Sequence, residues 1–78
     1  MDLDRYSEEL LDTVSKNVKK YREAKGLSQM QLGLEIGFTN GAYVGKAELR
    51  KANHHFNLKH LAKISKVLEV DICEFFKP

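Results

Sequence analysis

The sequence predicts an all-α fold, a compact five-helix bundle that includes a helix-turn-helix. Apolar residues of the 78-residue chain recur at three- and four-residue steps, which is the period of a helix rather than of a strand. Capping residues precede these apolar segments, and glycines end two of them. Residues 28–49 combine both features as two short helices joined by a glycine-led turn.

The first helix is expected to follow a partly ordered arm of residues 1–7 and to end at Gly26. Asp4 or Ser7 can cap its start, where acidic residues also suit the helix dipole. Its apolar face consists of Leu10 or Leu11, Val14, Val18 and Tyr21. The predicted organisation is therefore the arm followed by one helical domain, residues 8–78.

The second helix has the clearest start signal in the chain. Ser28 is a good N-cap, and Gln31 three residues later completes a capping box. Leu27 and Leu32 stand at the two positions of a hydrophobic staple. Gly37 ends the helix where a left-handed residue is needed. We therefore expect a short amphipathic helix directly before the turn.

The third helix follows that turn, with Thr39 or Asn40 as its cap. Its inward side is predicted to consist of Tyr43, Val44 and Ala47. In a helix-turn-helix, the second helix of the pair can enter the major groove of DNA.

Two further helices are expected after a polar and basic connection. Phe56 is the one large apolar residue of this connection and is predicted to tuck under it. Asn57 can cap a helix over residues 58–68, which carries a stripe of leucine and isoleucine. Asp71 and Glu74 have the capping-box spacing and open the last helix.

Charge is distributed unevenly along the chain, although the net charge is only +2. Residues 1–12 carry five acids and one base, residues 13–66 carry eleven bases and three acids, and residues 67–78 carry three acids and one base. A basic middle between acidic ends favours a polyanionic partner. The alternative is a solvated lysine face without a partner.

Several other classes of protein are not indicated. No apolar run approaches 18 residues, and no basic-then-apolar leader is visible, so we expect a cytoplasmic protein with no membrane span. His54, His55 and His60 lack a cysteine or carboxylate at ligand spacing, so no metal is expected. Cys73 is expected to be a small buried hydrophobe. No catalytic constellation is present, which predicts neither an enzyme nor a cofactor or small-molecule substrate.

A familiar pattern of residues extends from about Val18 to Phe76. Its members are Arg22, Gly26, Leu27, Ser28, Gln29, Leu32, Gly37, Val44, Glu48, Leu61, Ala62, Leu68, Val70 and Phe75. In this pattern the chain resembles the phage-repressor and Cro-type helix-turn-helix family, also called xenobiotic-response-element regulators. The resemblance implies a lambda-repressor-like domain that binds double-stranded operator DNA as a homodimer and regulates transcription, more often as a repressor.

The resemblance also implies roles for residues at the first turn of the second helix. Gln29 matches a polar residue that touches a phosphate, and Ser28 belongs to the same turn. Arg22 and Glu48 match a pair that links the first helix to the end of the recognition helix. The alternative for this pair is two unrelated surface charges.

The chain departs from the family pattern in two places. It is one residue longer between Gly37 and Glu48, an insertion that Gly41 can absorb. Gly33 stands where the family usually has alanine, which lowers helix propensity but permits close helix approach.

The outward face of the third helix supplies the expected base contacts. The candidates are Thr39, Asn40, Ala42, Tyr43 and Lys46. An asparagine can bind adenine, a lysine can donate to guanine, and an alanine can touch a thymine methyl group. Tyr43 is equally suited to core packing. The residues expected to meet phosphates after this helix are Arg50, Lys51, Asn53 and His54.

The apolar C-terminal segment is the predicted dimer surface, formed by Ile72, Phe75 and Phe76. The alternative is that Phe75 caps the core and Phe76 is a partly exposed surface residue. A competing function uses the same fold as an antitoxin or protein-bridging module that acts mainly through a protein partner.

Overall fold

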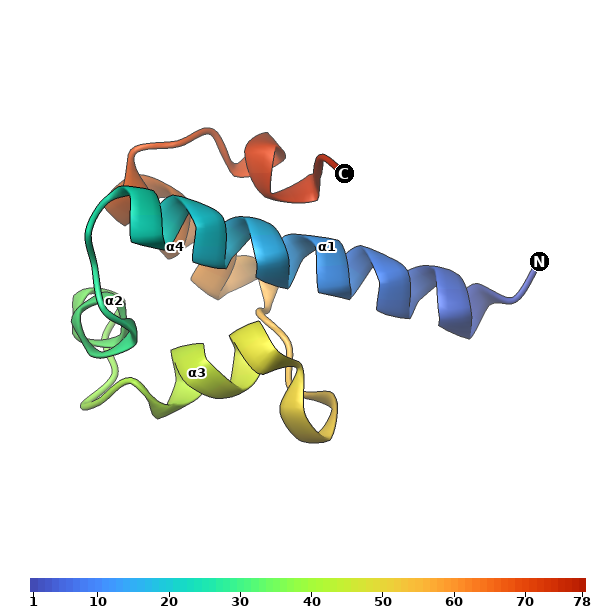
Figure 1. Cartoon of the computed structure of the whole chain (residues 1–78), viewed down its shortest axis with the longest axis horizontal. Helices are drawn as coiled ribbons and strands as arrows, with labels where there is room; N and C mark the ends of the chain where they lie inside the picture. Colours follow the sequence, from blue (N-terminus) through green and yellow to red (C-terminus); the bar gives the residue numbers. More distant parts are fainter.

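The protein is built from helices alone, in a computed structural model that describes residues 1–78 (Figure 1). The α-helices are α1 (Leu3–Ala24), α2 (Gln29–Glu35), α3 (Ala42–Leu49) and α4 (Leu58–Leu68). Two short 3-10 segments are η1 (Lys51–Asn53) and η2 (Ile72–Phe76). The all-α prediction is confirmed. The predicted fifth helix is instead the 3-10 segment η2.

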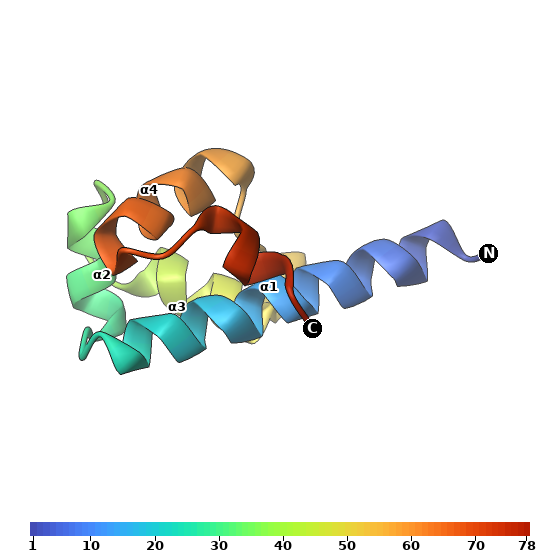
Figure 2. The ribbon, with the colours of Figure 1, turned by 90° about the horizontal axis from the view of Figure 1, so that it is seen from above.

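Helix α1 is longer than the sequence pattern indicates. It begins at Leu3, and the Asp2 side chain accepts a hydrogen bond from the Arg5 N–H at 3.0 Å. The expected arm of residues 1–7 is therefore mostly the first turns of α1, and Asp2 rather than Asp4 or Ser7 is the cap. Figures 1 and 2 both show this end of α1 extending past the rest of the molecule.

The caps predicted for two other helices are confirmed. Ser28 and Gln31 form the reciprocal capping box of α2, with bonds of 3.0 and 2.7 Å. Asn57 accepts from the His60 N–H at 2.7 Å and starts α4 at the predicted residue. Gly37 follows α2 with a φ of 105°, a left-handed conformation that glycine adopts without steric cost.

The core lies where the four α-helices and η2 meet. It consists of Val14, Val18, Leu32, Ile36, Val44, Ala47, Phe56, Leu61, Ile64, Leu68 and Phe75. Phe56 is buried under the α3–α4 connection, as predicted. Burial of this apolar set from every α-helix supplies the main driving force for bringing the short α2 and α3 against α1.

Segment η2 closes the core on the side of α1 that faces away from α3. Asn17 of α1 donates to the backbone oxygens of Phe75 and Lys77, at 2.9 and 2.7 Å. Glu74 accepts from the Tyr21 hydroxyl and pairs with Lys77, so it does not complete a capping box with Asp71. The last segment is a short 3-10 helix rather than the predicted α-helix.

Cys73 is exposed, and the expectation that it is buried is wrong. Cys73 lies on the outer side of η2, whereas Phe75 of the same segment points inward. None of the helices combines the length and apolar character that a membrane span requires.

Candidate nucleic-acid interface

Helices α2 and α3 approach each other through two glycines. A Cβ atom on Gly33 would lie 2.3 Å from the backbone oxygen of Asn40, and one on Gly41 would lie 2.7 Å from the backbone nitrogen of Met30. Neither distance is compatible with a side chain. The close packing of the α2–α3 turn therefore requires glycine at both positions, which accounts for the departure at Gly33.

The first N–H group of α3 is bonded by Asn40, which lies one residue before the N-cap. Gly41 occupies the N-cap position and has no side chain to offer. The Asn40 Oδ1 atom accepts from the Ala42 N–H at 2.8 Å instead. The Asn40 side chain thus satisfies the Ala42 N–H from the position before the N-cap, whereas the predicted N-cap at Thr39 or Asn40 is wrong, because Gly41 holds that position. Thr39 remains exposed.

The inner side of α3 is fixed against α1. Val44 and Ala47 are fully buried, and the Ser15 hydroxyl of α1 donates to the Ala47 backbone oxygen at 2.8 Å. These contacts determine which face of α3 is exposed to solvent.

The predicted link between Arg22 and Glu48 is present. The Arg22 Nε and Nη2 atoms donate to the two Glu48 oxygens at 2.7 and 3.0 Å, and the side chains are 8% and 1% exposed. Arg22 Nη1 also donates to the Leu27 backbone oxygen at 2.7 Å. The hydrogen bonds that Arg22 donates to Glu48 raise the pKa of Arg22, against the opposing effect of burial. This pair joins α1, the start of α2 and the end of α3.

Tyr43 belongs to an aromatic cluster, so of the two alternatives for this residue the structure favours core packing over a base contact. Its ring stacks on Phe38 with centroids 4.5 Å apart and meets Phe56 edge-on at 5.8 Å. Its hydroxyl accepts from the Asn57 N–H at 3.3 Å and lies 3.0 Å from the His60 Nδ1 atom. Burial raises the pKa of Tyr43, with the Asn57 bond opposing that rise. All of these contacts hold the ring on the body of the protein.

His60 packs into the same cluster rather than serving as a surface histidine. Its ring centroid lies 4.7 Å from that of Tyr43. Burial lowers the pKa of His60, and the charges of Lys63 and Lys59 lower it further. A neutral His60 can accept a hydrogen bond from the Tyr43 hydroxyl at Nδ1, which completes the polar contacts of this cluster.

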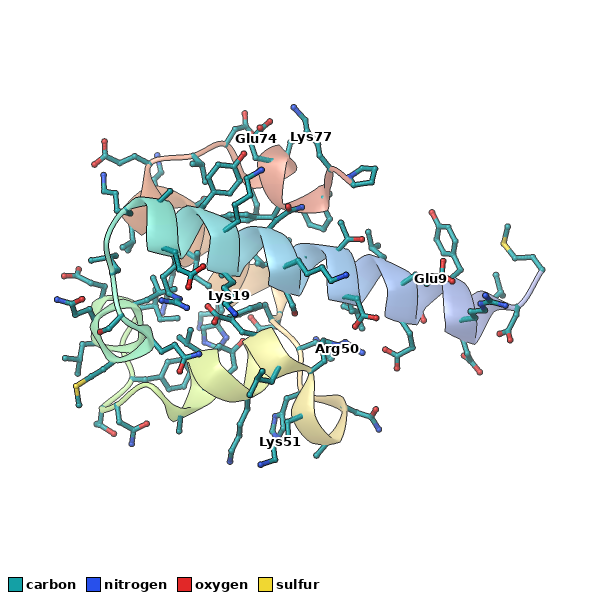
Figure 3. The ribbon with its side chains drawn as sticks, viewed as in Figure 1. Glu9, Lys19, Arg50, Lys51, Glu74 and Lys77 are labelled. Carbon is teal, nitrogen blue, oxygen red and sulfur yellow. The ribbon has the colours of Figure 1, made fainter.

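Exposed residues, all but one of them polar, remain along the outer side of α3 and the turns that flank it. They are Thr39, Asn40, Ala42, Lys46, Lys51, Asn53 and His54. Lys46 and Lys51 make no ion pair, so their ammonium groups are available to a ligand. Figure 3 shows Lys51 projecting from η1 on the side away from α1.

Arg50 differs from its predicted role as a free phosphate contact. Its guanidinium pairs with Glu8 and lies 3.4 Å from an Asp12 oxygen, both on α1, and its side chain is largely buried. Its backbone has a φ of 55°, the left-handed conformation that caps the end of α3. Arg50 therefore anchors the α3–α4 connection to α1. Sequence reasoning missed Glu8 and Asp12 because they lie about 40 residues away from Arg50 in the chain.

The first turn of α2 also uses its polar side chains internally. The Ser28 hydroxyl is occupied by the capping bond, and the Gln29 amide donates to Glu48 at 3.1 Å. Both predicted phosphate contacts are thus held by the protein itself, although Ser28 stays exposed.

Lys19 is a further cation beside α3 that sequence reasoning missed. It is four residues from Ser15 and three from Arg22 on α1, and both of these residues bind α3. Residues at these spacings share one face of a helix. Lys19 is exposed, and Figure 3 shows it between the α1 and α3 ribbons. The basic pattern of residues 13–66 was the signal that could have indicated it.

The predicted C-terminal dimer surface is not a continuous exposed patch. Phe75 is fully buried in the core, so its assignment to a surface is wrong. Ile72 is half-buried against the core, and Phe76 is partly exposed. Phe76 lies next to α1 in a hollow that also includes Tyr6 and Leu10.

The residues considered for a metal site are not brought together. No group of three or more histidine, cysteine or carboxylate side chains is arranged to hold an ion. His60 packs against Tyr43, whereas His54 and His55 lie in the connection before α4.

No protein-family model, curated protein or solved structure matches this chain in the comparisons. The resemblance to the phage-repressor and Cro-type family therefore stays a prediction from the sequence.

Proposed function

We propose that α2 and α3 form a helix-turn-helix and that the protein binds double-stranded DNA in a sequence-specific way as a transcriptional regulator. The observation that carries this proposal is the division of α3 into two sides. Its inner side is fixed by Val44, Ala47 and the Glu48 ion pair. Its outer side keeps Ala42 and an unpaired Lys46 exposed.

The proposed base-reading surface is smaller than the sequence indicated. It consists of Thr39, Asn40, Ala42 and Lys46, without Tyr43. The Asn40 amide group remains able to donate a hydrogen bond to a base edge, because only its oxygen is used in capping. Lys46 can donate to guanine, and Ala42 offers a methyl contact to thymine.

Phosphate contacts in this proposal come from the cations around α3. Lys51 lies two residues after the end of α3, and Lys19 flanks α3 from α1. Lysines placed on both sides of a recognition helix would position it on the duplex without reading sequence. Asn53 and His54 lie in the same exposed connection as Lys51.

Selection from a pool of random duplexes tests this proposal. We expect the full chain to enrich a defined motif, and the enriched duplex to bind more tightly than a scrambled one in fluorescence-anisotropy titrations. Binding should weaken steeply as salt is raised, because phosphate neutralisation releases counterions. A folded protein that enriches no motif and binds neither duplex at low salt would contradict the proposal.

A further inference from the structure

The first two turns of α1 leave an apolar stripe uncovered. We call residues Leu3–Leu10 the α1 overhang, because every one of them is exposed and the first buried residue of α1 is Val14. Leu3, Tyr6 and Leu10 are 72%, 58% and 39% exposed and lie at helical three- and four-residue steps. They form one apolar row on a segment that extends beyond the molecule (Figure 2).

A hollow lies at the inner end of this row. Its volume is about 170 Å³. It is lined by Tyr6, Glu9, Leu10, Thr13, Phe76 and Pro78. Further along the same side of α1, η2 covers the helix through the bonds of Asn17. The overhang is therefore the part of this helix side that η2 does not reach.

We propose that the α1 overhang binds the overhang of a second copy of this chain, with the two helices antiparallel about a two-fold axis near Tyr6. The proposal does not depend on DNA binding. It moves the dimer surface from the predicted C-terminal residues to α1, with Phe76 at its edge.

The spacing of the apolar residues makes the face self-complementary. Leu3 and Leu10 are seven residues apart, which is about 10 Å along a helix. In an antiparallel pair centred near Tyr6, Leu3 would reach Leu10 of the partner subunit and the hollow beside it. The two-fold axis repeats this contact, so Leu3 and Leu10 of each copy would be covered and the hollow of each copy would be filled.

The charges of the overhang favour the same register. Glu8 and Asp12 lie on the side of α1 opposite the stripe, where Arg50 neutralises them. The stripe is flanked instead by Arg5 and Glu9, which pair within the helix at 3.1 Å. In an antiparallel pair the same flanks meet, so Arg5 would come next to Glu9 of the partner subunit. In a parallel pair opposite flanks meet, so Arg5 and Glu9 would lack this pairing with the partner subunit.

The face is short, so the association should be weak. Eight helical residues span about 12 Å, and we expect dissociation in the micromolar range rather than an obligate dimer. Sedimentation velocity of the full chain from about 1 to 500 µM should show a reversible monomer–dimer equilibrium. A monomer over the whole range would overturn the proposal.

Two exposed leucines provide a matched pair of variants. Leu3→Lys should weaken dimerisation at least tenfold, because it places a cation in the apolar contact. Leu58→Lys should leave it unchanged, since Leu58 is similarly exposed, at 69%, but lies at the start of α4. Circular dichroism should show both variants folded. Equal loss in both variants, or no loss in Leu3→Lys, would overturn the assignment of the surface.

Cysteine cross-linking tests the register. In a Cys73→Ser background, Tyr6→Cys should form a disulfide dimer under mild oxidation, because position 6 lies beside the two-fold axis. Leu3→Cys should not, because the two copies of position 3 would be separated by about 10 Å along the helices. Cross-linking through position 3 but not position 6 would overturn the antiparallel arrangement. Binding of an unrelated protein to the overhang of a chain that stays monomeric would also overturn the proposal.

Discussion

The guanidinium of Arg22 donates to both carboxylate oxygens of Glu48, and almost no solvent reaches either side chain. The pair connects α1 to the last turn of α3, and Gln29 of α2 donates to the same carboxylate. The orientation of α3 thus depends on one buried ion pair as well as on the apolar core.

Replacing Glu48 with Gln should destabilise the protein by about 3 kcal/mol, because it leaves the buried charge of Arg22 without its counter-charge. Urea unfolding followed by circular dichroism measures this loss. The double variant Arg22→Met, Glu48→Met should lose less than half as much, since it buries no unpaired charge. A double variant that is less stable than Glu48→Gln would contradict this explanation.

Gly33→Ala should destabilise the protein by about 2 kcal/mol, although alanine is the better helix former. The new Cβ would meet the backbone oxygen of Asn40, which cannot move without displacing the α2–α3 turn. Thermal unfolding checks this expectation. Gly45→Ala is the matched control, because its Cβ would meet only the movable Gln29 side chain. Gly45→Ala should cause no loss of stability, and equal losses would argue against the close-approach explanation.

Stability should fall as the pH decreases below about 6.5, in part because of His60. Its pKa is lowered in the folded state, chiefly by burial, so the unfolded chain binds the proton more readily. The contribution of His60 is therefore complete above its unfolded pKa and is lost as the pH falls from that value through the lowered folded pKa. Unfolding measured between pH 7.5 and 5 should show a shallower decline for His60→Gln, which does not titrate. Parallel declines for the two proteins would exclude His60 as a cause.

Lys46→Ala and Lys51→Ala should affect DNA binding differently. Loss of Lys46 should reduce the preference for the selected motif over scrambled DNA roughly tenfold, because a base contact is removed. Loss of Lys51 should weaken binding to both duplexes alike and reduce the salt slope by about one unit. Lys77→Ala is a control, because Figure 3 places Lys77 across α1 from α3. Similar losses on both duplexes for Lys46→Ala would exclude a base-reading role.

The double variant Glu8→Gln, Asp12→Asn should bind DNA more tightly than the wild type. It removes two negative charges beside α3 and releases Arg50 for a phosphate contact. Anisotropy titrations at several salt concentrations should then give a slope steeper by about one unit. Glu69→Gln, which removes one negative charge at the end of α4, is the control and should leave the slope unchanged. An affinity that does not rise in the double variant would indicate that Arg50 has only a structural role.

Three of the helix boundaries that carry a local signal were predicted correctly. The capping box of Ser28 and Gln31, the Asn57 cap and the left-handed Gly37 act over three or four residues, and the structure has all three. The start of α1 was harder to predict, because Asp2, Asp4 and Ser7 could each cap a helix there. In the structure the earliest of the three is used, and helix formation continues from it.

The sequence by itself determined the helical class, the caps of α2 and α4 and the apolar rows that form the core, since each depends on residues within one or two turns. The tertiary structure alone decided that Tyr43 turns toward Phe38 and that Arg50 is held by Glu8. A tyrosine on α3 is equally compatible with either direction until the aromatic rings from other segments are present. An arginine likewise has no assigned partner until folding brings the acidic start of α1 beside it, because ion pairing depends on distance in space and not on separation in the chain.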